Sequence, residues 1–243
     1  MEKKKITIIG AGMMGSALAF PAAENGHEVH IVGTCLDDKI IDGYLATGKH
    51  EKFCRPFPEN VNYHYFKDWK TVVEGSDFVI GGVSSFGVDW FLEEILIQLD
   101  PEMPVLSVTK GLRATDDGSL LSYPGYWMSE LAKRGIHRDI CAVGGPCTSY
   151  ELVFKDPTEV AFCGWDNEVL RMMKQAMQRP YYHISLTNDV IGLESAVALK
   201  NAYAMAVTLA VGLNIRWHGE EEVQHFNSQA GTFTQAVRET HAL

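Results

Sequence analysis

The sequence predicts an α/β protein whose doubly wound parallel sheet is followed by an incomplete, all-helical C-terminal domain. Over residues 1–187, short apolar and β-branched runs alternate with helical stretches, which is typical of successive βαβ units. From residue 188 to residue 243 the pattern is helical, without a further strand. We therefore predict a sheet domain over 1–187 and a partial helical domain over 188–243.

The expected strands share a nearly continuous apolar character, which suits parallel strands covered by helices on both faces. They are expected at 5–10, 27–33, 76–83, 104–111 and 139–146, with two further strands at 158–164 and 181–187. A helix over 15–26 follows the first strand and ends at Asn25-Gly26, a typical C-terminal pair. Two helical stretches, at 188–213 and 227–243, flank an acidic turn.

The first motif is G-x-G-x-x-G, formed by Gly10, Gly12 and Gly15 between the first strand and the first helix. In that context Gly10 permits the tight turn, Gly12 lets the backbone approach a pyrophosphate, and Gly15 lets the helix pack closely on the strand. The helix N-terminus stabilises phosphate charge. The motif indicates a Rossmann-type site for a dinucleotide.

The choice between NAD and NADP depends on the end of the second strand, where an acidic residue usually binds the ribose of NAD. Gly33 and Thr34 follow that strand, and the acids Asp37 and Asp38 come several residues late. No arginine is placed to bind a 2′-phosphate. Both cofactors stay open, and the missing strand-end acid favours NADP.

Two motifs follow later strands. "SVTKG" places Lys110 at the carboxyl end of a parallel strand, where open α/β sheets bind ligands. "GGPCTSYE", residues 144–151, predicts a tight loop with free backbone N–H groups beside the cofactor. Cys147 lies in this loop, and because no histidine is placed to activate it, we interpret it as a packed thiol.

The segment "AVALKNAYAMAV", residues 196–207, is helical and apolar except for Lys200 and Asn201. Lysine is rarely buried unless it is paired or functional. A lysine desolvated near Lys110 would have a lowered pKa, which favours proton transfer near neutral pH. The alternative is a lysine whose stem follows the helix surface to solvent.

Composition excludes some classes of function. The formal net charge of −10 and the lack of a Lys/Arg cluster argue against a nucleic-acid partner. Five cysteines without a CxxC pair suggest reduced thiols in the cytoplasm. His218 and His225 are poorly spaced as ligands, so no metal site is expected. The three glycines of the motif argue against an N-terminal signal peptide, and we expect no run able to span a bilayer.

Taken in order, "IIGAGMMGSALA", "SVTKGL", "GGPCTSYE" and "ESAVALKNAYAMAVTLAVGL" resemble the NAD(P)-dependent, cytoplasmic glycerol-3-phosphate dehydrogenase family. The resemblance covers nearly the whole chain. It implies reduction of dihydroxyacetone phosphate, a phosphorylated small molecule, to sn-glycerol 3-phosphate by hydride transfer. The family's helical domain continues with an Asp-containing segment and an Arg-Asn pair that hold the substrate phosphate, and this sequence ends before them.

The resemblance also implies roles for single residues. Gly10, Gly12, Met13, Met14, Gly15 and Ser149 would bind the cofactor, and Lys110 would contact both the cofactor and the substrate. Gly145, Cys147 and Asn201 would border the substrate, and Lys200 would be the general acid/base. Cys147 stands where the family often has serine. The helix that carries Lys200 would then be buried because it forms the domain interface.

Two other functions stay open. One is a related two-domain reductase of another small carbonyl or hydroxy acid, of the ketopantoate reductase kind. The other is a catalytically silent dinucleotide-binding protein. The apolar side of "YAMAVTLAVGL", residues 203–213, needs a cover, which indicates a homodimer formed through the helical part.

Overall fold

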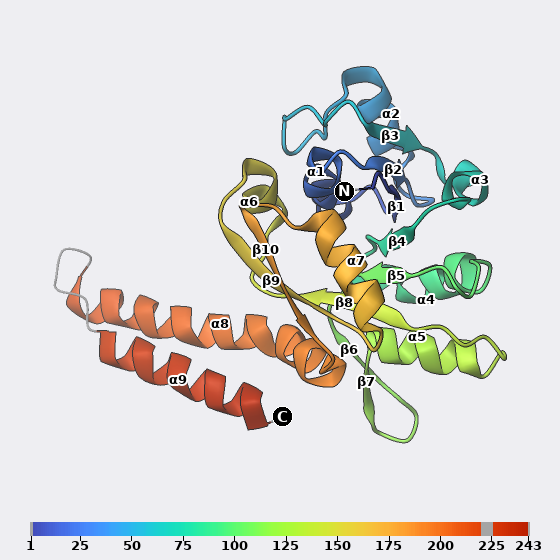
Figure 1. The fold of residues 1–243 in the computed structure, drawn as a ribbon. Coiled ribbons are helices and arrows are strands. Elements are labelled where there is room, and N and C mark those ends of the chain that lie inside the picture. The colour runs from blue at the N-terminus through green and yellow to red at the C-terminus, as the bar shows by residue number, and fades with distance from the viewer. Residues whose placement is uncertain (1, 220–225, 243) are drawn as a thin grey trace.

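The computed structural model describes residues 2–219 and 226–242 and contains an eight-stranded sheet in the order β10-β9-β8-β5-β4-β1-β2-β3 (Figure 1). The acidic turn expected between the last two helices, and His225 with it, lie outside the described residues. The strands of this sheet are β1 (Lys5–Ile9), β2 (Glu28–Val32), β3 (Val61–His64), β4 (Phe78–Gly81), β5 (Val105–Ser107), β8 (Ile140–Gly144), β9 (Thr158–Cys163) and β10 (Tyr182–Thr187).

The sheet is mixed, because the strand at 158–164 runs against the five predicted parallel strands. β1, β2, β4, β5 and β8 pair in parallel as expected, whereas β9 pairs antiparallel to β8. β10 is parallel to β9. Between β8 and β9 the chain forms only the six-residue helix α6 (Ser149–Phe154), and an antiparallel neighbour needs no long crossover.

Helices cover both faces of the sheet. The helices are α1 (Met13–Glu24), α2 (Asp38–Thr47), α3 (Trp69–Val73), α4 (Val88–Phe91), α5 (Tyr123–Ala132), α6, α7 (Asn167–Met177), α8 (Val190–His218) and α9 (Phe226–Ala242). α1 packs against α6 and α7 on one face, over a core that includes Ile6 and Ile8. α3, α4 and α5 contribute to the second core, which includes Ile9 and Val79. Alternate residues of one strand thus enter opposite cores.

Two strand regions were not predicted. β3 is the outer strand next to β2, and Val61 is its one buried residue, so its apolar signal is weak. A hairpin of β6 (Leu112–Ala114) and β7 (Leu120–Ser122) follows Lys110 and has no fully buried residue. Short strands without a buried face carry little periodicity for a sequence to reveal.

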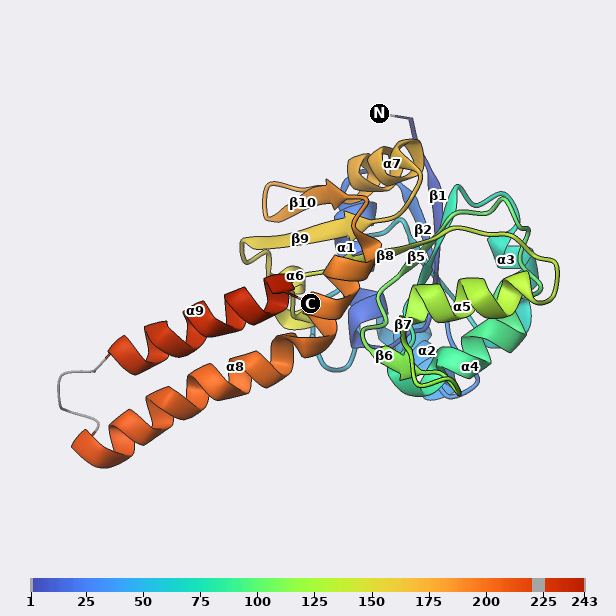
Figure 2. The ribbon, with the colours of Figure 1, turned by 90° about the horizontal axis from the view of Figure 1, so that it is seen from below.

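α8 and α9 lie side by side and extend away from the sheet (Figure 2). The predicted boundary between residues 187 and 188 falls in the turn between β10 and α8, and the division into two domains stays a prediction. α8 is less buried than expected, since Val190, Glu194 and Val197 are its fully buried residues. By length and composition α8 could cross a membrane, so the expectation that no run is long and apolar enough was wrong.

Candidate cofactor cleft and substrate pocket

The glycine loop after β1 is shaped by close backbone approaches. Gly10 has a φ of +113°, and a Cβ there would lie 2.6 Å from the carbonyl oxygen of Gly82. A Cβ on Gly15 would lie 2.2 Å from the carbonyl oxygen of Gly10, because α1 packs directly on the end of β1. Both positions therefore require glycine, for the two reasons that the sequence predicted.

Gly12 is different, because a Cβ there would meet nothing within 4 Å. It precedes α1 as the N-cap residue, and because it is glycine it has no side chain that could cap the first turn. The space beside the start of this twelve-residue helix is therefore open, which suits the phosphates of a dinucleotide. Met13 and Met14, the first residues of α1, line the same space.

The peptide group of Ala11, between Gly10 and Gly12, is held from both sides. Its N–H donates to Oδ2 of Asp37 at 3.1 Å, and its carbonyl oxygen accepts hydrogen bonds from Tyr44 at 2.9 Å and Ser16 at 3.0 Å. Oδ2 of Asp37 also accepts from the N–H and hydroxyl groups of Thr34, at 2.8 and 2.9 Å. The loop after β2 and helix α2 thus fix the glycine loop before any ligand binds.

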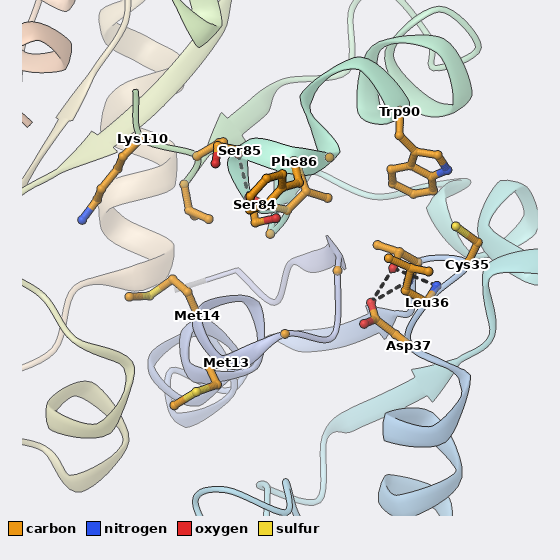
Figure 3. Close-up of a pocket in the computed structure, with 18 residues that line it drawn as sticks. Met13, Met14, Cys35, Leu36, Asp37, Ser84, Ser85, Phe86, Trp90 and Lys110 are labelled. Atoms are coloured by element: carbon orange, nitrogen blue, oxygen red, sulfur yellow. Dashed lines mark hydrogen bonds between the residues drawn. The ribbon is translucent and has the colours of Figure 1, made fainter. Parts of the chain in front are cut away.

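A cleft of about 560 Å³ lies along the carboxyl ends of β1, β4 and β5. Figure 3 shows Lys110 and Met14 at one end of this cleft, and Cys35 and Trp90 at the other. Sequence reasoning missed most of its walls, which are Thr34, Cys35, Leu36 and Asp37 after β2, and Ser84, Ser85, Phe86 and Trp90 after β4. The sequence did contain a signal for these residues: they follow predicted strands, and the loops after parallel strands form the ligand-binding edge of such a sheet.

Lys110 follows β5 and joins the cleft to a second, small pocket. That pocket, of about 20 Å³, is lined by Lys110, Met14, Gly145 and Cys147 among others. Nζ of Lys110 donates to the carbonyl oxygen of Gly145 at 3.4 Å. Burial lowers the pKa of Lys110, and the positive charge of Lys200 lowers it further. Burial raises the pKa of the Cys147 thiol to about 11, in agreement with a packed, unreactive cysteine.

Lys200 is on α8 and lines a groove of about 720 Å³ between α8 and α9 that reaches Gly145. Lys200 is exposed, so it is not desolvated as the sequence predicted. Of the two lysines, Lys110 is the one that burial desolvates. Asn201 is exposed and does not line this groove. Ser149 begins α6 and does not line the cleft or the small pocket. The structure thus brings Lys110, Gly145, Cys147 and Lys200 to one region, and the roles predicted for all these residues stay predictions.

Within residues 2–219 and 226–242, no group of three or more histidine, cysteine or acidic side chains could hold a metal ion. All five cysteines are unpaired thiols in the structure.

Known proteins agree with this architecture. A family profile described as the N-terminus of NAD-dependent glycerol-3-phosphate dehydrogenase matches residues 5–170. An NADP(+)-dependent glycerol-3-phosphate dehydrogenase of Archaeoglobus fulgidus is 30% identical over 238 residues, which cover 98% of this chain and 68% of that protein. A glycerol-3-phosphate dehydrogenase [NAD(P)+] of Clostridium botulinum is 23% identical, over 97% of this chain and 66% of its own length.

The fold agrees as well. The structure of a Plasmodium falciparum glycerol-3-phosphate dehydrogenase superposes with a TM-score of 0.81 at 21% identity, over 98% of this chain and 65% of that one. The chain thus spans about two thirds of the length of the relatives that it matches. The glycine loop, the cleft and these matches together place the chain in the NAD(P)-dependent glycerol-3-phosphate dehydrogenase family of oxidoreductases.

Proposed function

We propose that this chain interconverts dihydroxyacetone phosphate and sn-glycerol 3-phosphate, with NAD(H) or NADP(H) bound in the cleft between the glycine loop and Lys110. The cofactor supplies or accepts the hydride when it is bound. The observation that supports the proposal most is the continuity of the site: one cleft leads from the open start of α1 to Lys110 and the pocket at Gly145.

Three groups of the site have a proposed role. The amide groups at Gly12 and Met13 bind the pyrophosphate, as the open space at Gly12 allows. The ammonium of Lys110 attracts the phosphorylated substrate and lies beside the cofactor. During reduction, Lys200 donates a proton to the carbonyl oxygen as the carbonyl carbon accepts the hydride, and it takes the proton back during oxidation.

We propose NADP(H) as the preferred cofactor. Asp37 lies in the wall of the cleft, nearer to the glycine loop than its place in the sequence suggested. However, its Oδ2 already accepts three hydrogen bonds from Ala11 and Thr34, so this oxygen is committed to the protein rather than to a ribose. The relative from Archaeoglobus fulgidus, which is NADP(+)-dependent, supports the same preference. A cytoplasmic location is part of the proposal and is supported by the five unpaired cysteines.

The test is the oxidation of NADPH and of NADH by this chain with dihydroxyacetone phosphate. We expect turnover with both cofactors and a higher kcat/KM with NADPH. Cofactor binding without turnover would refute the activity and favour a silent dinucleotide-binding protein. Turnover with another small carbonyl compound alone would favour the related reductase.

A lysine variant tests the proposed proton transfer. Lys200→Ala is expected to lower kcat by about 10²- to 10⁴-fold, the usual contribution of a general acid, and to leave NADPH binding unchanged. Lys133→Ala, which removes an exposed lysine directly after α5, is the matched control. Undiminished turnover by Lys200→Ala would show that another group transfers the proton.

A further inference from the structure

The groove between α8 and α9 is a large cavity that the proposed mechanism leaves mostly unused. It has a volume of about 720 Å³, and facing stripes of the two helices form its walls. The stripe on α8 includes Val197, Lys200, Ala204 and Val207, which recur every three or four residues and therefore share one face of the helix. From α9, Phe233 and Val237 line the same groove.

The groove is open and largely apolar. Phe233 is 60% exposed and Val237 is 54% exposed, although both are apolar. Apolar side chains that gather at an exposed surface are typical of a site that another molecule covers. The volume of the groove lies within the range of small-molecule sites, which is about 300 to 1,000 Å³.

The charge of the groove is concentrated at one position. Among the described residues that line it, Lys200 is the only lysine or arginine, and none is acidic. Within the described part of the chain the ammonium of Lys200 has no hydrogen bond or ion pair. Gly145, from the loop after β8, lines the groove at the end near the sheet. From Lys200 to Thr208 the groove continues away from the sheet along eight residue steps of α8, which rise about 12 Å (Figure 2).

A second copy of the chain does not suit this groove. A two-fold contact through it would place two copies of Lys200 in an apolar interface, where no lining acid could pair with them. The exposed side chains of Met205 and Leu209 lie outside the groove, so a contact between helices of two copies can bury them without entering it. A small molecule with an anionic head group and a hydrocarbon tail, in contrast, matches both the lysine and the apolar walls.

We propose that the groove binds a single-chain amphiphile with an anionic head group, of the alkyl phosphate or fatty acid class. The head group lies at Lys200 on the side of Gly145, and the tail follows α8 and α9 towards Phe233. Because Lys200 and Gly145 also border the proposed substrate site, the bound head group excludes dihydroxyacetone phosphate. This last consequence alone rests on the proposed function.

The tail is tested by calorimetric titration with octyl phosphate and butyl phosphate, below the concentrations at which they form micelles. Each methylene group that the groove buries strengthens binding by about two- to fourfold. Octyl phosphate is therefore expected to bind about tenfold more tightly than butyl phosphate, or more. Equal affinities would overturn the proposal. Titration with octanoate, which has a carboxylate head, distinguishes a fatty acid from an alkyl phosphate as the preferred ligand.

A charge placed in the wall tests the location. Phe233→Glu is expected to weaken octyl phosphate binding about tenfold or more, because a carboxylate would stand against the tail. Leu209→Glu is the matched control, since Leu209 is 61% exposed, against 60% for Phe233, and lies outside the groove. Its affinity should equal that of the wild type. Thermal unfolding shows whether each variant is folded, and wild-type affinity in folded Phe233→Glu would overturn the proposal.

Other occupants of the groove give different results. Light scattering without ligand would reveal a dimer that Phe233→Glu dissociates and Leu209→Glu does not, and this result would assign the groove to a second copy. Sedimentation with phosphatidylcholine vesicles would reveal a membrane contact of the whole surface of α8 and α9, which both variants would weaken equally. Either result, found together with a lack of octyl phosphate binding, would overturn the proposal.

The position of the head group is tested by inhibition. Octyl phosphate is expected to raise the apparent KM for dihydroxyacetone phosphate without changing kcat, and to do so about tenfold less effectively in Phe233→Glu. Binding of octyl phosphate without such competition would overturn the placement of the head group at Lys200. If the wild type has no turnover, the proposed function fails, and the titrations still decide whether the groove binds an amphiphile.

Discussion

The buried carboxyl group of Glu194 predicts how stability depends on pH. Burial raises its pKa from an ordinary value of 4.5 to about 7 in the folded chain. Because the folded state then holds the proton more tightly than the unfolded state, the group costs nothing below about pH 4.5 and destabilises the fold progressively as the pH rises to 7. The difference of about 2.5 between the two values corresponds to about 3 kcal/mol, fully present above pH 7.

Glu194→Gln removes the charge and keeps the shape, so the comparison isolates this one titration. Urea unfolding of both proteins at several pH values gives the free energy of unfolding directly. We expect equal stabilities near pH 4.5 and a variant that is more stable by about 3 kcal/mol at pH 8. Parallel curves over this range would refute the reasoning, since they would mean that Glu194 titrates alike in the folded and unfolded states.

Four further predictions concern the cleft and the small pocket beside it. Gly15→Ala should destabilise the fold by about 2 kcal/mol or more in urea unfolding, because its Cβ meets a carbonyl oxygen at 2.2 Å. Gly12→Ala should keep the wild-type stability but raise the Kd for NADPH about tenfold or more by filling the phosphate site, and wild-type binding would contradict this site. Asp37→Ala should weaken NADH and NADPH equally in fluorescence titrations, whereas a selective loss of NADH would show that Asp37 binds the ribose. Iodoacetamide at pH 8 should modify exposed Cys35 before Cys147, whose pKa is raised to about 11, and mass spectrometry would reveal the reverse order.

The parts of the fold that the sequence predicted depend on local chemistry. The glycine loop was recognisable because two of its glycines meet local demands: Gly10 has a φ of +113°, and a Cβ on Gly15 would meet the carbonyl oxygen of Gly10, five residues before it. Lys110 was recognisable because it comes three residues after the end of a buried strand, β5. In both cases the residue and the structural reason for it lie close together along the chain.

The parts that were missed depend on contacts between distant segments. The direction of β9 is set by its pairing with β8, and nothing in its own residues specifies an antiparallel neighbour. In the sequence, Asp37 seemed too far from the second strand. The N–H group of Asp37 donates to the carbonyl oxygen of Thr34 at 3.1 Å, and the turn closed by this bond brings Asp37 back to the glycine loop. Glu194 did have a signal: it is a charged residue in an apolar helix, just as Lys200 is.

The reversal of β9 and β10 makes the spacing within α8 critical. Because β10 runs against β8, α8 begins at the edge of the sheet opposite the cleft, where Asp189 caps its first turn. The ten residue steps from Val190 to Lys200 rise about 15 Å, nearly the length of five-residue β8, so the lysine reaches the groove that extends to Gly145, just after β8. One inserted residue in this stretch would rotate Lys200 by about 100° around the helix axis. Under the role proposed for Lys200, a change in the length of α8 beyond this lysine would disturb the site less than a change before it.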